Sequence, residues 1–161
     1  RPNRIDRRII VSIDKDCKGV PCEFYDFNRG ELHDTSEEDA KKYHLMQTIA
    51  GDTVDGYKGV TGIGVVKANR LLENNGANWD TVLKAYSDAG MSEEEALMNA
   101  WMAYLIRKDE YNHKQKQLKY LWMPDSFTPQ QKRKYSQTIH GVTGVLDEEL
   151  GRHKPFETAG T

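Results

Sequence analysis

The stretch from Gly51 to Leu72 constrains this chain most, and it reads G-D-T-V-D-G-Y-K-G-V-T-G-I-G-V-V-K-A-N-R-L-L. Asp52 and Asp55 are three residues apart, so one helical turn would place both carboxylates on one face. Three glycines follow within six residues, and a helical pattern begins directly after them. Carboxylates suit hard cations, and bare backbone amides at a helix start can approach a phosphate. The stretch therefore predicts a protein that handles phosphodiesters.

The glycine loop differs from two well-known phosphate-binding loops. Its spacing is G-x-x-G-x-G with no strand before it, unlike the dinucleotide fingerprint, and it lacks the G-K-[ST] of a Walker loop. We interpret it as a hairpin between two helices that grips the DNA backbone without reading bases. The alternative is a plain helix–helix turn, which rarely needs so many glycines. The residues expected to contact phosphate are Gly59, Gly62 and Gly64 through the backbone and Lys58, Lys67 and Arg70 through charge.

A second pair of carboxylates follows a β-branched run near the start of the chain. Arg7–Ile13 is predicted to be a buried strand. Because strand side chains alternate, Asp14 and Asp16 would project together from its C-terminal edge. Alone, Asp14 and Asp16 are more typical of a turn, and Asp52 and Asp55 are equally typical of one. Together, the four carboxylates predict a site for Mg²⁺ or Mn²⁺.

The remaining pattern indicates an α/β fold that is mostly helical. Glu23–Phe27 and Glu31–His33 flank a turn and predict a hairpin. Capping patterns and apolar periodicity predict four helices. They run from Thr35 and Glu38 to Ala50, from Val65 to Glu73 with Val66, Leu71 and Leu72 buried, around Trp79–Tyr86, and from Ser92 and Glu95 through Leu105.

After the last of these helices the pattern weakens. Leu118–Met123 is predicted to be a last strand or an extended arm, and Gln130–Ile139 a weak helix. Arg152–Thr161 is expected to be a mobile tail. We therefore expect three parts: residues 1–34 with the first acidic pair, residues 35–124 with the DNA-binding region, and a C-terminal tail over residues 125–161.

Composition narrows the classes of protein that fit. The 161 residues carry a net charge of −2, which argues against a generally basic nucleic-acid binder but allows local basic faces. The sequence has no apolar run of the roughly 18 residues that a membrane span needs and no signal peptide. Cys17 and Cys22 have no partner pair for zinc, and we expect reduced thiols and a cytoplasmic location. The chain begins with Arg1, which suggests a processed chain or a fragment.

These motifs resemble the 5′-nuclease (flap endonuclease) superfamily, and most closely the 5′–3′ exonucleases of T7-like phages. G-D-T-V-D-G-Y-K-G-V-T-G-I-G is similar to the family signature G-D-x-x-D-N-x-x-G-V-x-G-I-G. The upstream S-I-D-K-D is similar to the end of the family's strand, and H-L-M-Q-T-I-A-G-D supports the match. The resemblance covers about Arg8 to Pro124 and implies a PIN-like α/β fold with a helix–three-turn–helix region.

The resemblance also implies roles for particular residues. By it, Asp14, Asp16, Asp52 and Asp55 are the metal-site carboxylates of a two-metal hydrolysis of DNA. The helix–three-turn–helix clamp comprises Thr61, Gly62, Ile63, Gly64 and Lys67. A potassium ion can bind there through backbone carbonyls, for which Val60 and Ile63 are the candidates.

The chain departs from the family pattern in two places. Cys17, Lys18 and Gly19 stand where the family usually has Leu and Gln. The acidic N-terminal half of the family is absent, and Glu37–Asp39 is no substitute, since acids are expected at a helix start. We therefore expect the C-terminal half of a 5′–3′ exonuclease or flap endonuclease that acts on duplex DNA with 5′ ends or flaps. Either the chain is truncated or a separate N-terminal half completes it. The alternative is a non-catalytic, sequence-independent DNA-binding module.

Overall fold

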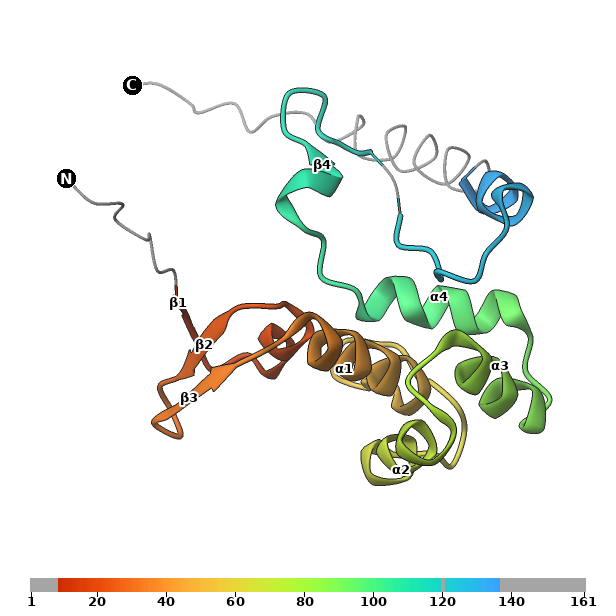
Figure 1. Cartoon of the computed structure of the whole chain (residues 1–161), viewed down its shortest axis with the longest axis horizontal. Helices are drawn as coiled ribbons and strands as arrows, with labels where there is room; N and C mark the ends of the chain where they lie inside the picture. Colours follow the sequence, from red (N-terminus) through yellow and green to blue (C-terminus); the bar gives the residue numbers. More distant parts are fainter. Residues whose placement is uncertain (1–8, 120, 137–161) are drawn as a thin grey trace, which may run out of the picture. The chain divides into compact units, whose positions relative to one another are not determined.

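A computed structural model of the chain describes residues 9–119 and 121–136. These residues are mixed α/β, with a three-stranded sheet and helices, which agrees with the expected fold class (Figure 1). They divide into two compact units at the boundary between Asp109 and Glu110. None of the helices in these ranges is long and apolar enough to cross a lipid bilayer.

The sheet of the first unit combines one parallel and one antiparallel pairing. Strand β1 (Ile9–Ser12) pairs in parallel with β2 (Glu23–Asp26), and β2 pairs antiparallel with β3 (Glu31–Asp34). The hairpin turn between β2 and β3 ends at Gly30, whose φ of 70° is open to glycine at little cost. The predicted hairpin is therefore confirmed.

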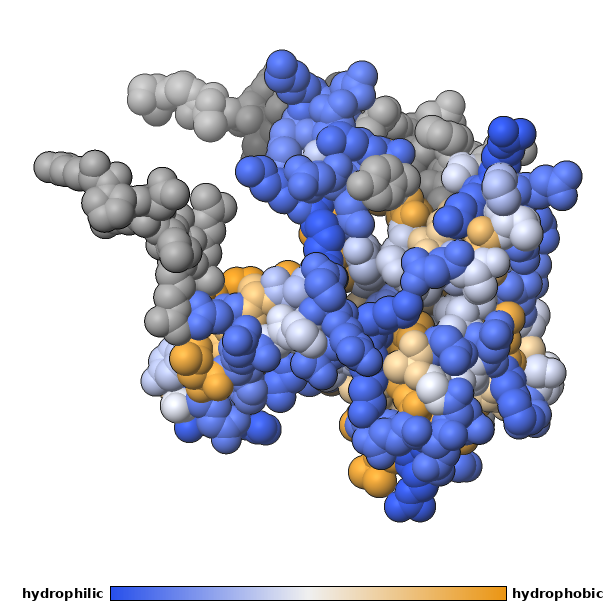
Figure 2. Space-filling view, viewed as in Figure 1, coloured by the Kyte–Doolittle hydropathy of each residue, from blue (hydrophilic) through white to orange (hydrophobic). Residues whose placement is uncertain are grey.

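Strand β1 lies at an edge of this sheet and is not buried, which corrects the sequence-based expectation. Side chains along it and just after it remain exposed, at 42% for Ile9, 62% for Val11 and 60% for Ile13. Figure 2 shows hydrophobic surface over this sheet. Apolar side chains on both faces are typical of a strand inside a parallel sheet covered on both sides. Within the described residues, however, β1 pairs only with β2.

Helix α1 (Glu37–Ala50) is the centre of the first unit. It packs against α2 (Val65–Asn75), α3 (Trp79–Asp88), α4 (Glu93–Ala103) and the short 3₁₀ helix η1 (Lys15–Gly19). Its C-terminal half is buried on all sides, because five consecutive residues from Leu45 to Ile49 are buried. The buried apolar side chains around it include Leu72, Val82, Tyr86, Leu97 and Phe24.

Two details of the helices differ from the sequence interpretation. Helix α1 is capped by Ser36, whose hydroxyl accepts a hydrogen bond from the Asp39 amide, one residue later than the predicted Thr35 box. Val66 on α2 is 75% exposed, whereas Ala68 and Leu72 form the buried face. In α4 the predicted capping box of Ser92 with Glu95 is confirmed.

The second unit contains little regular structure within the described residues. Residues 108–110 form the 3₁₀ helix η2 (Lys108–Glu110), which crosses the boundary between the two units. Strands β4 (Tyr111–Asn112) and β5 (Gln117–Leu118) form a short antiparallel hairpin, and residues 129–136 are helical. The weak helix is thus confirmed where it is described. Its continuation to Ile139 and the expected tail Arg152–Thr161 lie outside the described residues.

A buried histidine joins α1 to the end of α4. His44 Nε2 lies 2.8 Å from the Ala100 carbonyl oxygen, which is among the last four carbonyls of α4 and has no partner within that helix. The ring also packs edge-on against Tyr104. Burial lowers the pKa of His44 to about 4, so at neutral pH the imidazole is uncharged and donates its N–H to the carbonyl.

We expect this histidine to make the fold acid-sensitive. Between pH 6.5 and 4 the unfolded chain binds a proton at His44 that the folded chain rejects, so stability falls as the pH is lowered through that window. The loss approaches about 3 kcal/mol at pH 4. Urea unfolding at several pH values should show a shallower acid slope in His44→Gln. The exposed His113, changed to Gln, should keep the wild-type slope, and equal slopes in all three proteins would contradict this account.

Candidate metal centre and nucleic-acid interface

Three of the four predicted carboxylates converge in the first unit. Asp16 lies in η1, Asp52 directly follows the last residues of α1, and Asp55 lies in the turn after it. One oxygen from each lies within 4.8 Å of the others. Segments 36 residues apart in the sequence, from Asp16 to Asp52, are brought together because η1 packs against α1.

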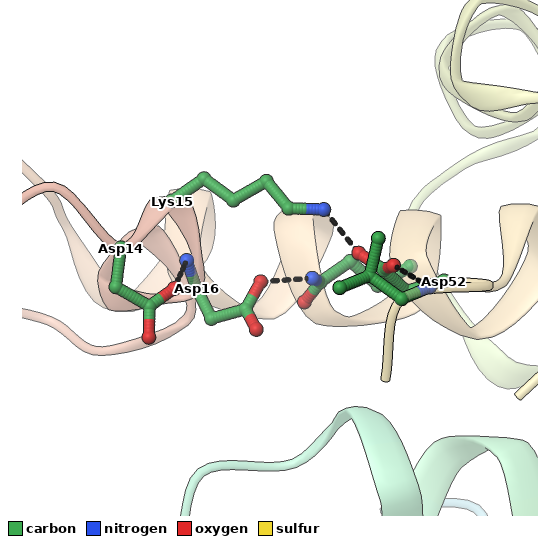
Figure 3. Close-up of polar contacts among 6 residues, drawn as sticks. Asp14, Lys15, Asp16 and Asp52 are labelled. Atoms are coloured by element: carbon green, nitrogen blue, oxygen red, sulfur yellow. Dashed lines mark hydrogen bonds and ion pairs between the residues drawn. The ribbon is translucent and has the colours of Figure 1, made fainter. Parts of the chain in front are cut away.

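The fourth carboxylate, Asp14, lies beside this group but is not part of it. The strand ends at Ser12, and Asp14 becomes the N-cap of η1, where its Oδ1 accepts a hydrogen bond of 2.9 Å from the Asp16 amide (Figure 3). The argument from alternating strand side chains was therefore wrong, because the chain turns before Asp16. Asp14 does line the same open depression of about 540 Å³ as Asp52.

Asp52 is the most firmly held member of the group, and it is buried. Its Oδ1 accepts a hydrogen bond of 2.9 Å from the Val54 amide, and its Oδ2 pairs with the ammonium of Lys15 (Figure 3). Its backbone exchanges two hydrogen bonds with Tyr57, of 2.8 and 3.0 Å. The hydrogen bond from Lys15 holds the pKa of Asp52 below its usual value, so the carboxylate is ionised at neutral pH.

Asp16 has the opposite electrostatic environment. Partial burial raises its pKa, and the hydrogen bond that Gln47 Nε2 donates to its Oδ1, at 2.6 Å, only partly opposes this effect. The negative charges of Asp14 and Asp55 raise the pKa further. A divalent cation would relieve this repulsion. The donor set is all oxygen and partly buried, so these residues fit Mg²⁺ or Mn²⁺.

Sequence reasoning missed two residues of this site. Lys15 pairs with Asp52, and Gln47 reaches Asp16 from α1. The D-K-D motif places Lys15 between Asp14 and Asp16 in the sequence, but nothing local indicates that its ammonium pairs with Asp52. Gln47 gave no signal, because an isolated glutamine in a helix is usually solvated.

The glycines that follow fall into two structural groups. Gly51 and Gly59 are packed backbone to backbone, since a Cβ on Gly51 would lie 2.3 Å from the Lys58 carbonyl carbon and one on Gly59 would lie 2.3 Å from the Gly51 amide nitrogen. By contrast, a Cβ on Gly62 or Gly64 would meet nothing within 4 Å. The first pair fixes the loop to the end of α1, and the second pair faces open space.

The exposed part of the loop leads into the start of α2. Gly64 is the N-cap of α2 and supplies no side-chain cap, so the first amides of that helix keep their donor capacity. Thr61 is exposed, and Ile63 is half-buried with its amide donating to the Val60 carbonyl at 3.1 Å. Within the described residues, Lys58, Lys67 and Arg70 are all exposed on this loop and helix.

A side chain from α4 supports the loop from behind. Asn99 Oδ1 accepts a hydrogen bond of 3.0 Å from the Gly59 amide, and the Val60 amide donates to the Ile49 carbonyl at 2.8 Å. The buried Val60 side chain anchors the same point. Asp52 and the exposed glycines therefore adjoin one packed backbone crossing, which makes the two candidate sites neighbours.

A carboxylate cluster of this kind, in an α/β fold and beside an exposed glycine loop, is what a nuclease would use. Comparison with known proteins agrees with that class: the chain is related to the exonucleases of T7-like phages. It is 31% identical to the exodeoxyribonuclease of Enterobacteria phage T3, over 74% of this chain and 50% of that protein. It is also 31% identical to the exonuclease of Escherichia phage T7, over 73% of this chain and 49% of that protein.

The match has a clear limit in extent. The chain spans about half the length of the curated relatives it matches. No protein-family model matches it. No solved structure matches it either.

Proposed function

We propose that this chain is the C-terminal portion of a metal-dependent 5′–3′ exonuclease or flap endonuclease that hydrolyses DNA phosphodiesters. The observation that carries the proposal is the convergence of Asp16, Asp52 and Asp55 beside the glycine loop. Relatives with the printed names exonuclease and exodeoxyribonuclease support the same reaction class. They favour an enzyme over a DNA-binding module without catalysis.

In this proposal the three carboxylates hold Mg²⁺ or Mn²⁺, and Asp14 supports them by capping η1. Bound cations would supply activation of the attacking water and stabilisation of charge on the phosphate oxygens. A two-metal reaction needs carboxylates around two ions about 4 Å apart. Three acids suit one ion, so we assign the remaining ligands of the second ion to the part of the nuclease that this chain lacks.

The loop from Gly59 to Gly64 would bind the backbone of duplex DNA. The open space at Gly62 and Gly64 allows a phosphate to approach the amides at the start of α2, and Lys67 adds a cation. The Val60 carbonyl oxygen accepts one hydrogen bond, from the Ile63 amide, and keeps a second lone pair. The backbone carbonyls of Val60 and Ile63 therefore remain our candidates for binding K⁺. Such a clamp holds DNA without sequence preference.

We expect Gly64→Val to weaken binding of duplex DNA by about tenfold, because a side chain there fills the space that the phosphate needs. The φ of Gly64 is −87°, so the substitution adds bulk without backbone strain. Fluorescence anisotropy with two unrelated duplexes measures the affinity. Circular dichroism checks that the helices persist.

Salt dependence provides the matched control for the loop. Lys67→Met should lower the slope of log affinity against log salt by about one unit, because one phosphate contact is lost. Lys42→Met should leave that slope unchanged, since Lys42 is already paired with Glu73 at 3.0 Å. Wild-type affinity in Gly64→Val, together with a wild-type slope in Lys67→Met, would contradict the proposed DNA clamp.

The exposed sheet edge supports a further part of the proposal. Strand β1 has the apolar composition of an interior strand, yet Ile9, Val11 and Ile13 are exposed. We propose that the N-terminal half of the nuclease, on the same or a separate chain, covers this edge and supplies the missing acids. The assembled enzyme would act on duplex DNA with 5′ ends or flaps.

A cleavage assay tests the proposed function. The substrate is duplex DNA labelled at its 5′ end, incubated with Mg²⁺ and this chain, alone or with an N-terminal half taken from a related phage exonuclease. We expect the chain alone to bind DNA and cleave it very poorly, and the combination to release labelled product from the 5′ end. Binding without cleavage in both cases would favour the DNA-binding module instead.

A further inference from the structure

The ammonium of Lys15 binds one member of the carboxylate cluster, Asp52. The ammonium pairs with Asp52 Oδ2 (Figure 3), and the charges of Asp52, Asp16 and Asp55 all act on it. The side chain of Lys15 is 61% exposed, whereas that of Asp52 is only 7% exposed. An exposed cation thus pairs with a buried anion.

The position of this ammonium conflicts with metal binding. Asp52 Oδ1 accepts a hydrogen bond from the Val54 amide, and one oxygen of Asp52 lies within 4.8 Å of an oxygen of Asp16 and of Asp55. Lys15 pairs with Oδ2 of Asp52. A divalent cation held by the three acids would also use Asp52, and it would repel the ammonium at such short range. Lys15 and the metal therefore compete for Asp52.

The lysine can leave without disturbing the fold. Its backbone lies in η1, while its flexible four-carbon stem is largely in solvent. Once displaced, the ammonium remains tethered beside the cluster. A DNA substrate bound at the proposed metal centre would present a phosphodiester anion to this ammonium.

We propose that Lys15 is a placeholder cation: it neutralises Asp52 while the site holds no metal, and it moves to a phosphate of the DNA when a divalent cation takes Asp52. The proposal rests on the proposed function, because it assumes that Asp16, Asp52 and Asp55 hold the metal. It makes Lys15 a positioning residue for both cation and substrate. Nothing in the acid pattern alone assigns it that role.

Calorimetric titration with Mn²⁺ tests the first step on the 161-residue chain. Lys15→Met should bind Mn²⁺ about five- to tenfold more tightly than wild type, because the competing charge is gone. Lys18→Met is the matched control, since Lys18 lies in the same 3₁₀ helix and borders the same depression. It removes the same net charge without touching Asp52, and Lys15→Arg should keep the wild-type affinity.

The second step is tested by DNA binding in the presence of Ca²⁺. Ca²⁺ binds oxygen ligands as Mg²⁺ does, and it is used here so that binding is measured without cleavage of the DNA. Lys15→Met should bind a duplex about threefold more weakly than Lys18→Met does. Should Lys15→Met fail to fold, Lys15→Gln keeps a donor for Asp52 and replaces it in both titrations. Thermal unfolding identifies that case beforehand.

The outcomes separate the inference from the proposed function. Equal Mn²⁺ affinity in Lys15→Met and Lys18→Met would overturn the placeholder role, and equal DNA affinity would overturn the move to phosphate. In either case a lower Mn²⁺ affinity of Asp52→Asn would leave the proposed metal centre standing. Mn²⁺ binding that is the same in wild type and Asp52→Asn would overturn the metal centre, and the inference with it.

Discussion

Replacing Gly51 or Gly59 with alanine is expected to prevent folding, or to lower the free energy of unfolding by at least about 3 kcal/mol. A Cβ on Gly51 would lie 2.3 Å from the carbonyl carbon of Lys58, and one on Gly59 would lie 2.5 Å from the carbonyl oxygen of Ile49. These are backbone atoms, which cannot move aside as a side chain can. Both glycines also have positive φ, of 71° and 60°, which adds strain.

Gly56→Ala separates the two causes. Its φ is 84°, so it carries the conformational cost, but a Cβ there would meet nothing within 4 Å. We expect it to lose only about 1–2 kcal/mol. Urea unfolding of the three variants measures the difference. If Gly51→Ala and Gly59→Ala are as stable as Gly56→Ala, the backbone crossing can accommodate a Cβ, and the account of close backbone packing is wrong.

The second large effect concerns hydrolysis. In the proposed nuclease, completed with an N-terminal half, Asp52→Asn is expected to lower the cleavage rate by at least about a thousandfold, because a ligand charge is lost where phosphate charge must be neutralised. Asn retains the size of Asp and can still accept a hydrogen bond from the Val54 amide. The change therefore tests charge more than packing. Single-turnover cleavage of a 5′-labelled duplex is the measurement.

Asp14→Asn is the matched control for that experiment. Asp14 Oδ1 caps η1 by accepting from the Asp16 amide, and an Asn oxygen can do the same. We expect a loss of no more than about tenfold if Asp14 acts through this cap. A loss equal to that of Asp52→Asn would show that Asp14 is a direct ligand, as the family resemblance implies.

Much of the helical framework could be predicted from local sequence signals. The capping box of Ser92 with Glu95 and the hairpin ending at Gly30 depend on neighbouring residues, and the structure contains both. The start of α1 was misplaced by one residue, because Thr35 and Ser36 are both good caps and the local sequence does not decide between them.

The exposure of β1 could not be predicted. Its Ile and Val residues indicate a buried strand, but burial depends on what covers the strand. The apolar composition of β1 shows that the strand is suited to a buried position, but it does not show which elements cover the strand. The apolar edge therefore agrees better with the proposed covering partner than with a buried core.

The candidate site was predictable in its acids and less so in its geometry. Spacing and chemistry indicated four acids, Asp14, Asp16, Asp52 and Asp55, and the structure brings the last three of them together. The direction of Asp14 depended on where the strand ended, which alternation alone does not determine. The glycine pattern likewise did not reveal that Gly51 packs against Gly59, since contacts between distant backbone segments leave no local signal.

Binding of a divalent cation by Asp16, Asp52 and Asp55 is tested most directly by a Mn²⁺ titration that is monitored by electron paramagnetic resonance. We expect the chain to bind Mn²⁺ weakly, and Asp16→Asn, Asp52→Asn and Asp55→Asn each to reduce that binding by at least about tenfold. Lys18→Met serves as the control that leaves the three acids intact. Equal Mn²⁺ binding by wild type and the three Asn variants would contradict the metal centre.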